Sequence, residues 1–438
     1  MKLRRLILSR AARVSVHGLG VIGLPLALLL CRSGFRVVGV DTSERRLEEI
    51  EEKRAAAREK GVPELLEEAL SSRRLQLVRS LSEADETQIH VICVPTPIEE
   101  GRADLSYVRQ AMAEICGHMS EGELIVVEST LPPLSSERIL IPLAEELTGL
   151  AEGEGFYYAY CPERAYPGKL IEELVENSRV IGCRSREAGE LASLLYRAFV
   201  RGEIAVTSLR VAEAVKLAEN AYRDLNIAFA NELALICEEI KAPVNEVIKL
   251  ANMHPRVSIL KPGIGVGGTC LTKDPLFLAS FSRQSVIRAG REINSRMPEH
   301  AAAALLESLT QLGLELKIAV LGVTYRGDVD VAVETPVRPL VEKLIEAGAE
   351  VKVYDPYVSE GFGAQVASSL REAVRGANCI VIGADHAVFR EMDLRKLRSM
   401  VERQGPVVFF DGKLAFDRKT VEESGFIYRA PGVPLGIA

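Results

Sequence analysis

The sequence has no tryptophan, few aromatic residues and no excess of positive charge. Phe, Trp and Tyr together make up 5% of the 438 residues, and the formal net charge is −7. A negative balance argues against nucleic acid or an anionic membrane surface as a partner. Asn and Gln are also scarce, a composition that is more common in heat-adapted proteins.

Long apolar runs are missing as well. The longest, from Leu24 to Cys31, contains a proline and is too short to cross a bilayer. The basic segment from Met1 to Arg13 lacks the apolar stretch and the small-residue cleavage site of a signal peptide. We therefore expect a cytoplasmic protein without membrane attachment.

The eight cysteines contain no Cys-x-x-Cys pair. Their spacing excludes a zinc knuckle or a thioredoxin-type site and predicts reduced thiols and no metal site. Six of them lie in apolar runs and are expected in the core. Only Cys161 and Cys270 lie in contexts that are typical of polar loops.

With 438 residues, 47% of them hydrophobic, the chain is too long for one ordinary core. Strand patterns alternate with helical patterns in both halves, which is typical of doubly wound α/β domains. Residues 207–239 form a long helical pattern without glycine or proline. We predict two Rossmann-like domains, 1–203 and 301–438, joined by a helical domain, 204–300, that contains this long helix.

The first domain opens with a dinucleotide-binding pattern. A strand from Arg13 is followed by Gly18-x-Gly20-x-x-Gly23, a helix, and a second strand that ends in Asp41. This spacing brings a carboxylate to a ribose 2′-hydroxyl, and an acid at that position favours NAD over NADP. The neighbouring Arg45-Arg46 pair is expected to be a solvated part of the next helix.

Three further strand patterns end in polar or turn-forming residues, at Pro95-Thr96-Pro97, Ser129-Thr130 and Glu163-Arg164. Because the carboxyl ends of parallel strands form the ligand-binding edge of such a sheet, we expect these residues beside the nucleotide. For Thr96, a cofactor contact and a rigid turn fit the pattern equally well.

The densest glycine cluster, Gly263 to Gly268, leads directly into Cys270. Four glycines in six residues let backbone amides approach a ligand closely. A thiol at a helix N-terminus is stabilised as the thiolate, so Cys270 is a candidate nucleophile, with Asp274 one turn later. Taken alone, the segment fits a glycine-rich turn with an incidental cysteine equally well.

Two polar residues on the long helix, Lys216 and Asn220, are spaced i, i+4 and point the same way. A wet helix surface is the simpler interpretation, but Glu213 extends the same polar stripe on an otherwise apolar helix. The apolar residues exceed one helix face, so the helix could bridge domains and pack on a partner subunit.

In the last domain, the strand-end segment Gly322 to Gly327 lacks the three-glycine fingerprint. We therefore expect a nucleotide-like domain with a different ligand, in which Arg326 and Lys413 could grip phosphate. Pro298 is expected to begin the helix that leads into this domain.

Taken in order, these motifs closely resemble the UDP-glucose/GDP-mannose dehydrogenase family over essentially the whole chain. The resemblance rests on Gly18-x-Gly20-x-x-Gly23, Val94-Pro-Thr-Pro97, Glu128-Ser-Thr130, Cys161-Pro-Glu-Arg164, the Lys216/Asn220 helix, Gly265-Val-Gly-Gly-Thr-Cys270 and Tyr325-Arg326. It implies oxidation of the C6 alcohol of a UDP-sugar to an acid with two NAD, in a homodimer or higher homo-oligomer. Segments such as Tyr160 to Gly168 favour UDP-N-acetyl-D-mannosamine, with UDP-N-acetylglucosamine, UDP-glucose and a non-catalytic nucleotide-sugar sensor as alternatives.

The resemblance also implies roles for individual residues. Cys270 would capture the C6 aldehyde, and Lys216 and Asn220 would stabilise the oxyanion, with general base as an alternative role for Lys216. Water would be positioned or activated by Thr130, Glu163 and Asp274. Implied cofactor contacts are Gly18, Gly20, Val21, Ile22, Gly23, Asp41, Arg46, Pro95, Thr96 and Thr130. Implied substrate contacts are Glu163, Arg164, Lys216, Asn220, Arg256, Gly263, Gly267, Tyr325, Arg326 and Lys413, with Arg256 reaching across a dimer interface.

Two positions depart from the family pattern. Val333-Glu-Thr-Pro336 stands where an Arg-Glu-Ser-Pro segment is usual, which puts one NAD contact in doubt. Lys413 stands where arginine is common, so a phosphate there would lose bidentate hydrogen bonding.

Overall fold

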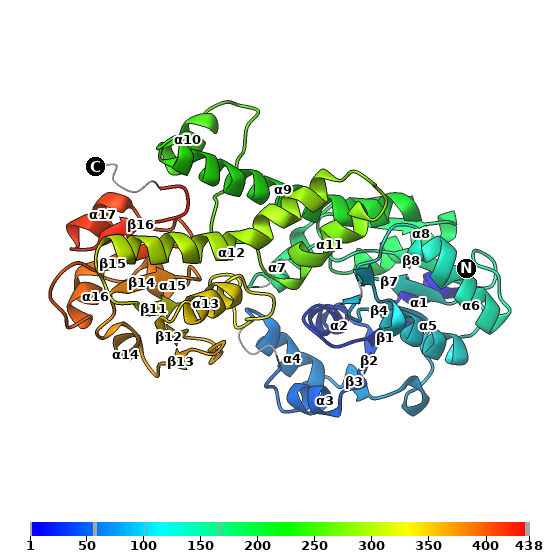
Figure 1. Cartoon of the computed structure of the whole chain (residues 1–438). Coiled ribbons are helices and arrows are strands. Elements are labelled where there is room, and N and C mark those ends of the chain that lie inside the picture. Colours follow the sequence, from blue (N-terminus) through cyan, green and yellow to red (C-terminus); the bar gives the residue numbers. More distant parts are fainter. Residues whose placement is uncertain (1, 56–58, 100, 166–167, 434–438) are drawn as a thin grey trace. The chain divides into compact units, whose positions relative to one another are not determined.

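The computed structural model of the chain describes residues 2–55, 59–99, 101–165 and 168–433. The chain forms two compact units, Met1–Glu219 and Asn220–Ala438, and Figure 1 labels their elements. The division falls within the longest helix, α9 (Leu209–Glu239, 31 residues), which confirms the helix predicted over 207–239. The three domain boundaries expected from the sequence stay a prediction.

An eight-stranded sheet forms the centre of the first unit, in the order β10-β9-β8-β7-β4-β1-β2-β3. Neighbouring strands are parallel except β8 and β9. The run from β3 to β8 has the 3-2-1-4-5-6 order of dinucleotide-binding folds, which confirms the predicted fold class. The strands are β1 (Arg13–His17), β2 (Arg36–Val40), β3 (Leu75–Val78), β4 (Ile89–Ile92), β7 (Leu124–Val127), β8 (Tyr157–Tyr160), β9 (Arg179–Cys183) and β10 (Ile204–Ser208).

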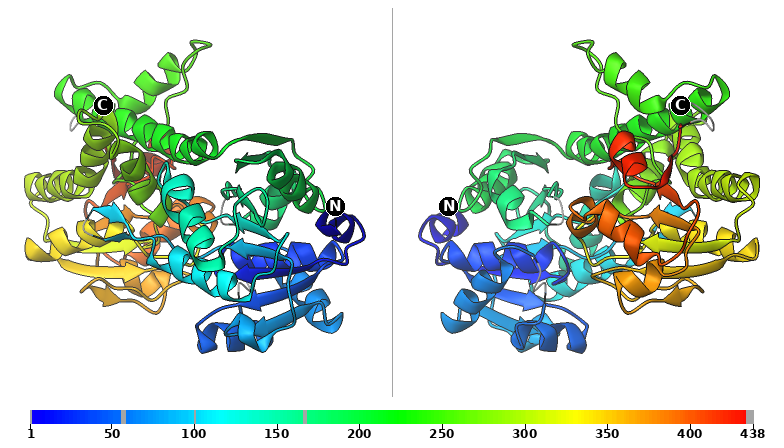
Figure 2. Two further views of the ribbon diagram at one scale, coloured as in Figure 1. Left: turned by 90° about the vertical axis from the view of Figure 1, so that its right-hand side faces the viewer. Right: turned by 90° about the vertical axis from the view of Figure 1, so that its left-hand side faces the viewer.

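Helices cover both faces of this sheet, as the two views in Figure 2 show. Side chains alternate along β1, so that Val14 and Val16 pack under α2 while Ser15 and His17 face the opposite layer. The helices are α1 (Lys2–Leu8), α2 (Gly23–Arg32), α3 (Glu44–Glu51), α4 (Val62–Ser71), α5 (Ser106–His118), a π-helical turn (Ser136–Leu140), α6 (Ile141–Thr148), α7 (Leu170–Glu176) and α8 (Arg186–Tyr196). A 3₁₀ turn (Leu81–Glu83) and a small hairpin, β5 (Ile98–Glu99) with β6 (Arg102–Ala103), complete the unit.

The second unit contains a six-stranded, fully parallel sheet in the order β13-β12-β11-β14-β15-β16. This is the same 3-2-1-4-5-6 winding again. The strands are β11 (Lys317–Leu321), β12 (Glu350–Tyr354), β13 (Gln365–Val366), β14 (Cys379–Ile382), β15 (Val408–Asp411) and β16 (Ile427–Arg429). The helices are α10 (Val244–Ala251), α11 (Thr269–Ala279), α12 (Val286–Gln311), α13 (Val337–Glu346), α14 (Leu370–Val374), α15 (Ala387–Arg390), α16 (Leu394–Met400) and α17 (Arg418–Glu423).

The expected start of the linking helix at Pro298 was wrong. The helix begins twelve residues earlier, at Val286, and Pro298 lies inside α12. The Ser285 side chain caps it by accepting a hydrogen bond from the backbone N–H of Arg288. A proline in a helix leaves the carbonyl four residues earlier without its usual donor. That carbonyl belongs to Asn294, and the glycine loop passes it so closely that a Cβ on Gly265 would lie 3.1 Å from its oxygen.

In the described part of the chain, no helix combines the length and the apolar character that a membrane crossing requires.

Candidate active site

The turn between β1 and α2 requires two of its glycines. Gly18 has a φ of +87°, and a Cβ there would lie 2.7 Å from the carbonyl oxygen of Cys93. A Cβ on Gly23 would lie 1.8 Å from the carbonyl oxygen of Gly18. By contrast, an added Cβ on Gly20 meets no described atom within 4 Å. The turn thus keeps an open cradle at the head of α2, and this fits the pyrophosphate of a dinucleotide.

Asp41 follows β2 and faces this turn. One carboxylate oxygen accepts a hydrogen bond from the backbone N–H of Leu19 at 2.9 Å, and the other accepts from that of Ser43 at 2.9 Å. The half-buried carboxylate keeps lone pairs for a ribose hydroxyl. Arg46 is not the solvated residue expected from the sequence, because its Nε donates to the carbonyl oxygen of Leu19 at 2.8 Å.

The ends of β4 and β7 meet as predicted at the same edge. The Ser129 hydroxyl donates to the carbonyl oxygen of Val94 at 2.8 Å, which ties the two strand ends together. Thr96 is buried, Thr130 is half-buried and Pro95 is exposed. The cofactor contacts implied for these residues stay predictions.

In the same unit, polar residues that follow β8 contact the first part of α9. The ammonium of Lys216, from α9, donates to the backbone carbonyl oxygen of Glu163 at 2.5 Å. Arg164 makes a two-pronged ion pair with Glu219 and donates to the carbonyl oxygen of Ser178 at 2.9 Å. Glu219 was not predicted, although its place between Lys216 and Asn220 on a helix of known period could have signalled it.

Two residues of this region, Cys161 and Glu213, are more buried than the sequence predicted. Cys161 was expected in a polar loop, but it is fully buried, and burial raises its pKa to about 12. Glu213 is also buried, where its carboxylate accepts from the backbone N–H groups of Leu134 and Ser136. Because Leu134 has a φ of +72°, Glu213 fixes an unusual backbone turn and is not part of a wet helix surface.

Cys270 is the second residue of α11, as predicted, and it alone of the eight cysteines, all of them in the described ranges, is exposed. In the same unit, the side-chain amide of Asn220 donates to the buried carboxylate of Asp274 at 2.7 Å. The thiol therefore stands at a helix N-terminus, one turn from a carboxylate that is held in place. An accessible thiol in this position is suited to nucleophilic attack.

The glycine loop before Cys270 lies against the carboxyl edge of the second sheet. A Cβ on Gly267 would lie 2.4 Å from the carbonyl oxygen of Glu334, and one on Gly268 would lie 2.8 Å from the ring of Tyr325. At the other end of the loop, the backbone N–H of Ile264 donates to the carbonyl oxygen of Gly412 at 3.1 Å. The structure thus brings together the predicted segments 263–268, 325–326 and 412–413.

The half-buried Lys413 lies at this edge. Its ammonium has a pKa below the ordinary value, because desolvation outweighs the attraction of Asp385. Arg256, by contrast, lies in the exposed loop that follows α10, where its backbone N–H donates to Nδ1 of His254. Its assignment to a substrate site across a dimer interface stays a prediction.

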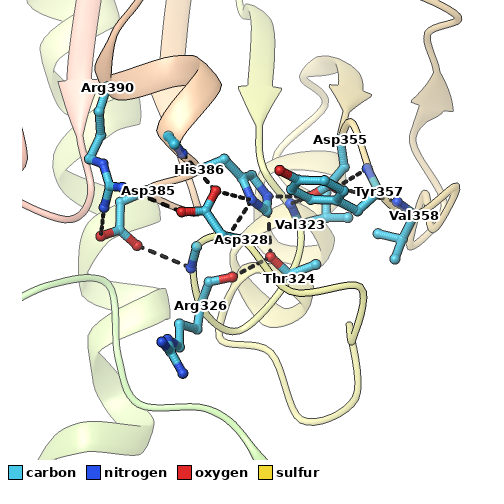
Figure 3. Close-up of polar contacts among 12 residues, drawn as sticks. Val323, Thr324, Arg326, Asp328, Asp355, Tyr357, Val358, Asp385, His386 and Arg390 are labelled. Atoms are coloured by element: carbon cyan, nitrogen blue, oxygen red, sulfur yellow. Dashed lines mark hydrogen bonds and ion pairs between the residues drawn. The ribbon is translucent and has the colours of Figure 1, made fainter. Parts of the chain in front are cut away.

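A polar cluster that the sequence did not predict occupies the end of β12 (Figure 3). His386 is fully buried, and its Nε2 donates to Asp355 at 2.9 Å while its Nδ1 accepts from the backbone N–H of Asp328 at 2.9 Å. Asp355 also accepts from the backbone N–H groups of Val323 and Tyr357, at 2.8 Å each. Burial would raise the pKa of Asp355, but these hydrogen bonds outweigh it and hold the pKa below its ordinary value.

A cavity of about 780 Å³ adjoins the glycine loop within the second unit. Arg291 and Asn294 of α12 line one side, and Val333 to Thr335 and Arg338 line another. Val333, at the position where the family resemblance predicts an arginine, is exposed here.

The turn after β1, with its open cradle and neighbouring carboxylate, defines an NAD-binding α/β protein. The exposed thiol at the head of α11 adds a nucleophile, which hydride transfer by itself does not require.

Comparison with known proteins agrees with this class. Three models of the UDP-glucose/GDP-mannose dehydrogenase family match in succession: its NAD binding domain at residues 12–200, its central domain at 210–296 and its UDP binding domain at 319–418. The chain therefore belongs to this family and is an NAD-dependent nucleotide-sugar dehydrogenase.

Relatives are similar over nearly their whole length. A UDP-N-acetyl-D-mannosamine dehydrogenase of Methanococcus maripaludis is 40% identical, over 96% of this chain and 97% of that protein. The solved structure of a UDP-D-ManNAc dehydrogenase from Pyrococcus horikoshii is 40% identical with a TM-score of 0.88, covering 96% of this chain and 99% of that one. A UDP-N-acetyl-mannosamine dehydrogenase structure from Staphylococcus aureus is 36% identical with a TM-score of 0.85, covering 96% and 98%.

Proposed function

We propose that the chain oxidises UDP-N-acetyl-D-mannosamine at C6 to UDP-N-acetyl-D-mannosaminuronate. The observation that carries this proposal is the exposed Cys270 at the head of α11, in a chain whose first unit holds a dinucleotide turn. Relatives named UDP-N-acetyl-D-mannosamine dehydrogenase are similar to the chain over nearly its whole length, which supports the choice of substrate.

The reaction would consume two NAD and one water for each sugar. Bound NAD supplies a hydride acceptor, once for the alcohol and once for the captured aldehyde. In the first oxidation C6 loses a hydride and O6 loses a proton, which leaves an aldehyde. The Cys270 thiolate then forms an S–C6 bond, and the loss of a second hydride from C6 converts this thiohemiacetal into a thioester.

Water completes the reaction by attacking C6, so that a C–O bond forms, the C–S bond breaks and the thiolate is regenerated. Lys216 and Asn220 would stabilise the oxyanions that develop on O6, a type of contact whose removal costs about 10²- to 10³-fold in rate. Thr130, Glu163 and Asp274 would orient water or accept its proton.

The substrate is tested by counting NADH released for each UDP-sugar consumed. We expect two NADH with UDP-N-acetyl-D-mannosamine, and much lower kcat/KM with UDP-N-acetylglucosamine, UDP-N-acetylgalactosamine and UDP-glucose. A higher kcat/KM with one of the other three sugars would reassign the substrate.

The covalent step is tested with Cys270→Ala. This variant should lose acid formation and keep its NAD affinity, because the dinucleotide turn lies in the first unit. Cys237→Ala is the matched control, since Cys237 is a buried thiol of the second unit outside the glycine loop. Acid formation at the native rate by Cys270→Ala would refute the covalent route.

We also propose that the enzyme is a homodimer that works in the cytoplasm. Tyr222, Phe229 and Ile236 recur every seven residues on α9 and are all exposed, so they form an apolar stripe along the helix, and the exposed Ile240 follows directly after its end. The free thiols, including the exposed Cys270, are typical of proteins from a reducing compartment. Light scattering should give twice the chain mass, and Phe229→Glu should give monomers; a native monomer would contradict the dimer.

A further inference from the structure

A buried ionic cluster in the first unit lies behind Glu163 and has no part in the scheme above. Its centre is Arg179 on β9, whose side chain is 2% exposed. Nη1 of Arg179 donates to Oε2 of Glu163 at 2.8 Å and lies 3.8 Å from Oε1 of Glu128. A buried ion pair of this kind adds little net stability, because desolvation offsets much of the attraction between the charges.

The cluster holds both oxygens of the Glu163 carboxylate. Oε2 accepts from Arg179, while Oε1 accepts from the backbone N–H groups of Arg164 and Ala165. A glutamate with three flexible torsions is thereby fixed in one orientation at the end of β8. The same turn presents the Glu163 carbonyl oxygen to Lys216.

Arg179 is itself held in place by its surroundings. Its guanidinium lies 5.3 Å from the ring centre of Tyr196, on α8, and the Tyr196 hydroxyl donates to Glu128 at 2.5 Å. Burial raises the pKa of Glu128 to about 7, against the attraction of Arg179. Among the described side chains, Arg179 is the one cation within 4 Å of either carboxylate.

We propose that Arg179 is a positioning residue that orients the Glu163 carboxylate for hydrolysis of the Cys270 thioester. Glu128 and Tyr196 contact the guanidinium and keep it in place. The inference rests on the proposed function, since it requires that Glu163 act on the hydrolytic water. Arg179 contacts neither substrate nor cofactor in this scheme and acts only through Glu163.

The test compares Arg179→Gln with Glu163→Gln. Because both changes impair hydrolysis and leave the two hydride transfers, each variant should release NADH from its first turnover and then stall as a thioester on Cys270, visible by intact-protein mass spectrometry. Steady-state kcat should fall about 100-fold or more, the usual range for lost general-base assistance, with KM for the UDP-sugar within about threefold of native. The double variant should be no slower than Glu163→Gln, because the two residues act as one unit.

Controls separate positioning from folding. Arg201→Gln removes an exposed arginine of the same unit that pairs with Glu176. This variant should keep the native kcat and should accumulate no thioester on Cys270. If Arg179→Gln does not fold, Arg179→Lys keeps the charge but loses the fork, and Tyr196→Phe removes only the hydroxyl. Both should show a weaker form of the same stalled thioester.

The possible failures are distinct. If Glu163→Gln makes acid at the native rate, the role proposed for Glu163 is wrong. If Glu163→Gln stalls as the thioester while folded Arg179 variants do not, or slow the first hydride transfer instead, this inference alone is overturned.

Discussion

The two sheets of the molecule share one strand order and the same backbone hydrogen bonds at the turn after the first strand. They differ in the surroundings of the acid that follows the second strand. In the first unit, Gly18 donates to Val40 at the end of β2, and Leu19 donates to Asp41. In the second unit, Gly322 donates to Tyr354 at the end of β12, and Val323 donates to Asp355. Gly18 and Gly322 have φ values of +87° and +85°.

The difference lies in what covers the carboxylate. Asp41 is half-buried and bonded only to backbone N–H groups among the described residues, whereas the Asp355 side chain is 1% exposed and is sealed by His386. A sealed acid cannot receive a ribose hydroxyl. We therefore expect the second edge to bind a different ligand, through the glycine loop and cations such as Lys413, although the backbone geometry is the same.

The largest expected effect comes from removing the buried carboxylate of Asp355. Asp355→Ala should lower the free energy of unfolding by about 3 kcal/mol or more, because His386 and two backbone N–H groups lose their buried acceptor. Urea denaturation followed by circular dichroism measures this loss, and NAD affinity should stay within about twofold of native. Asp417→Ala, at an exposed helix cap of the same unit, should cost only about 1 kcal/mol. Equal losses would remove the contrast between Asp355 and an ordinary cap.

The strand before each turn offers the next comparison, because His17 ends β1 where Leu321 ends β11. Burial, aided by the nearby His90 and His118, lowers the pKa of His17 to about 3. An unfolded chain protonates this histidine near pH 6.5, so between pH 6.5 and about 3 the unfolded state binds more protons. Stability should fall as the pH falls through this window, by about 1.4 kcal/mol per pH unit at most.

His17→Leu, which makes the first strand resemble the second, should remove this contribution. Unfolding midpoints in urea at pH 7.5 and pH 4.5 would be compared for native protein and variant. The control is His254→Leu, in an exposed loop, which should keep the native acid sensitivity. Parallel losses of stability in native protein and His17→Leu would show that this histidine is not the acid-sensitive group.

Removing the open acid should have a more moderate effect. Asp41→Ala should weaken NAD binding by about 10- to 100-fold, the loss of one or two hydrogen bonds to a charged group, with little change in affinity for UDP. Isothermal titration with each ligand measures both. Unchanged NAD affinity would remove the proposed ribose contact and with it the functional contrast between Asp41 and Asp355.

The smallest expected effect restores the usual family residue. Val333→Arg places a cation on an exposed position beside the cavity of the second unit, and it should tighten NAD binding by a few-fold, below about 1 kcal/mol. The gain should shrink at high salt, since exposed charges are screened. Val333→Gln is the uncharged control. Weaker NAD binding in Val333→Arg would show that the valine fits this chain's own way of holding the cofactor.

Part of the first sheet could not be predicted, for reasons of packing. Strand β10 is largely exposed along Ile204–Ser208, and β9 carries the buried Arg179, so neither shows the continuous apolar run of a central strand. Pro298 misled for a similar reason: a proline usually marks a helix boundary, but here a passing glycine loop occupies the space beside the carbonyl that it leaves without a donor.

The sequence by itself determined the two windings, the dinucleotide turn and the position of Cys270 at the head of a helix, because glycine spacing and strand periodicity are local properties of the chain. Only the tertiary structure decided which polar residues are sealed and which stay open. Asp41 and Asp355 look alike in the sequence, each an acid at the end of a second strand. Their difference arises from His386, thirty-one residues further along the chain, which packing alone brings onto the second carboxylate.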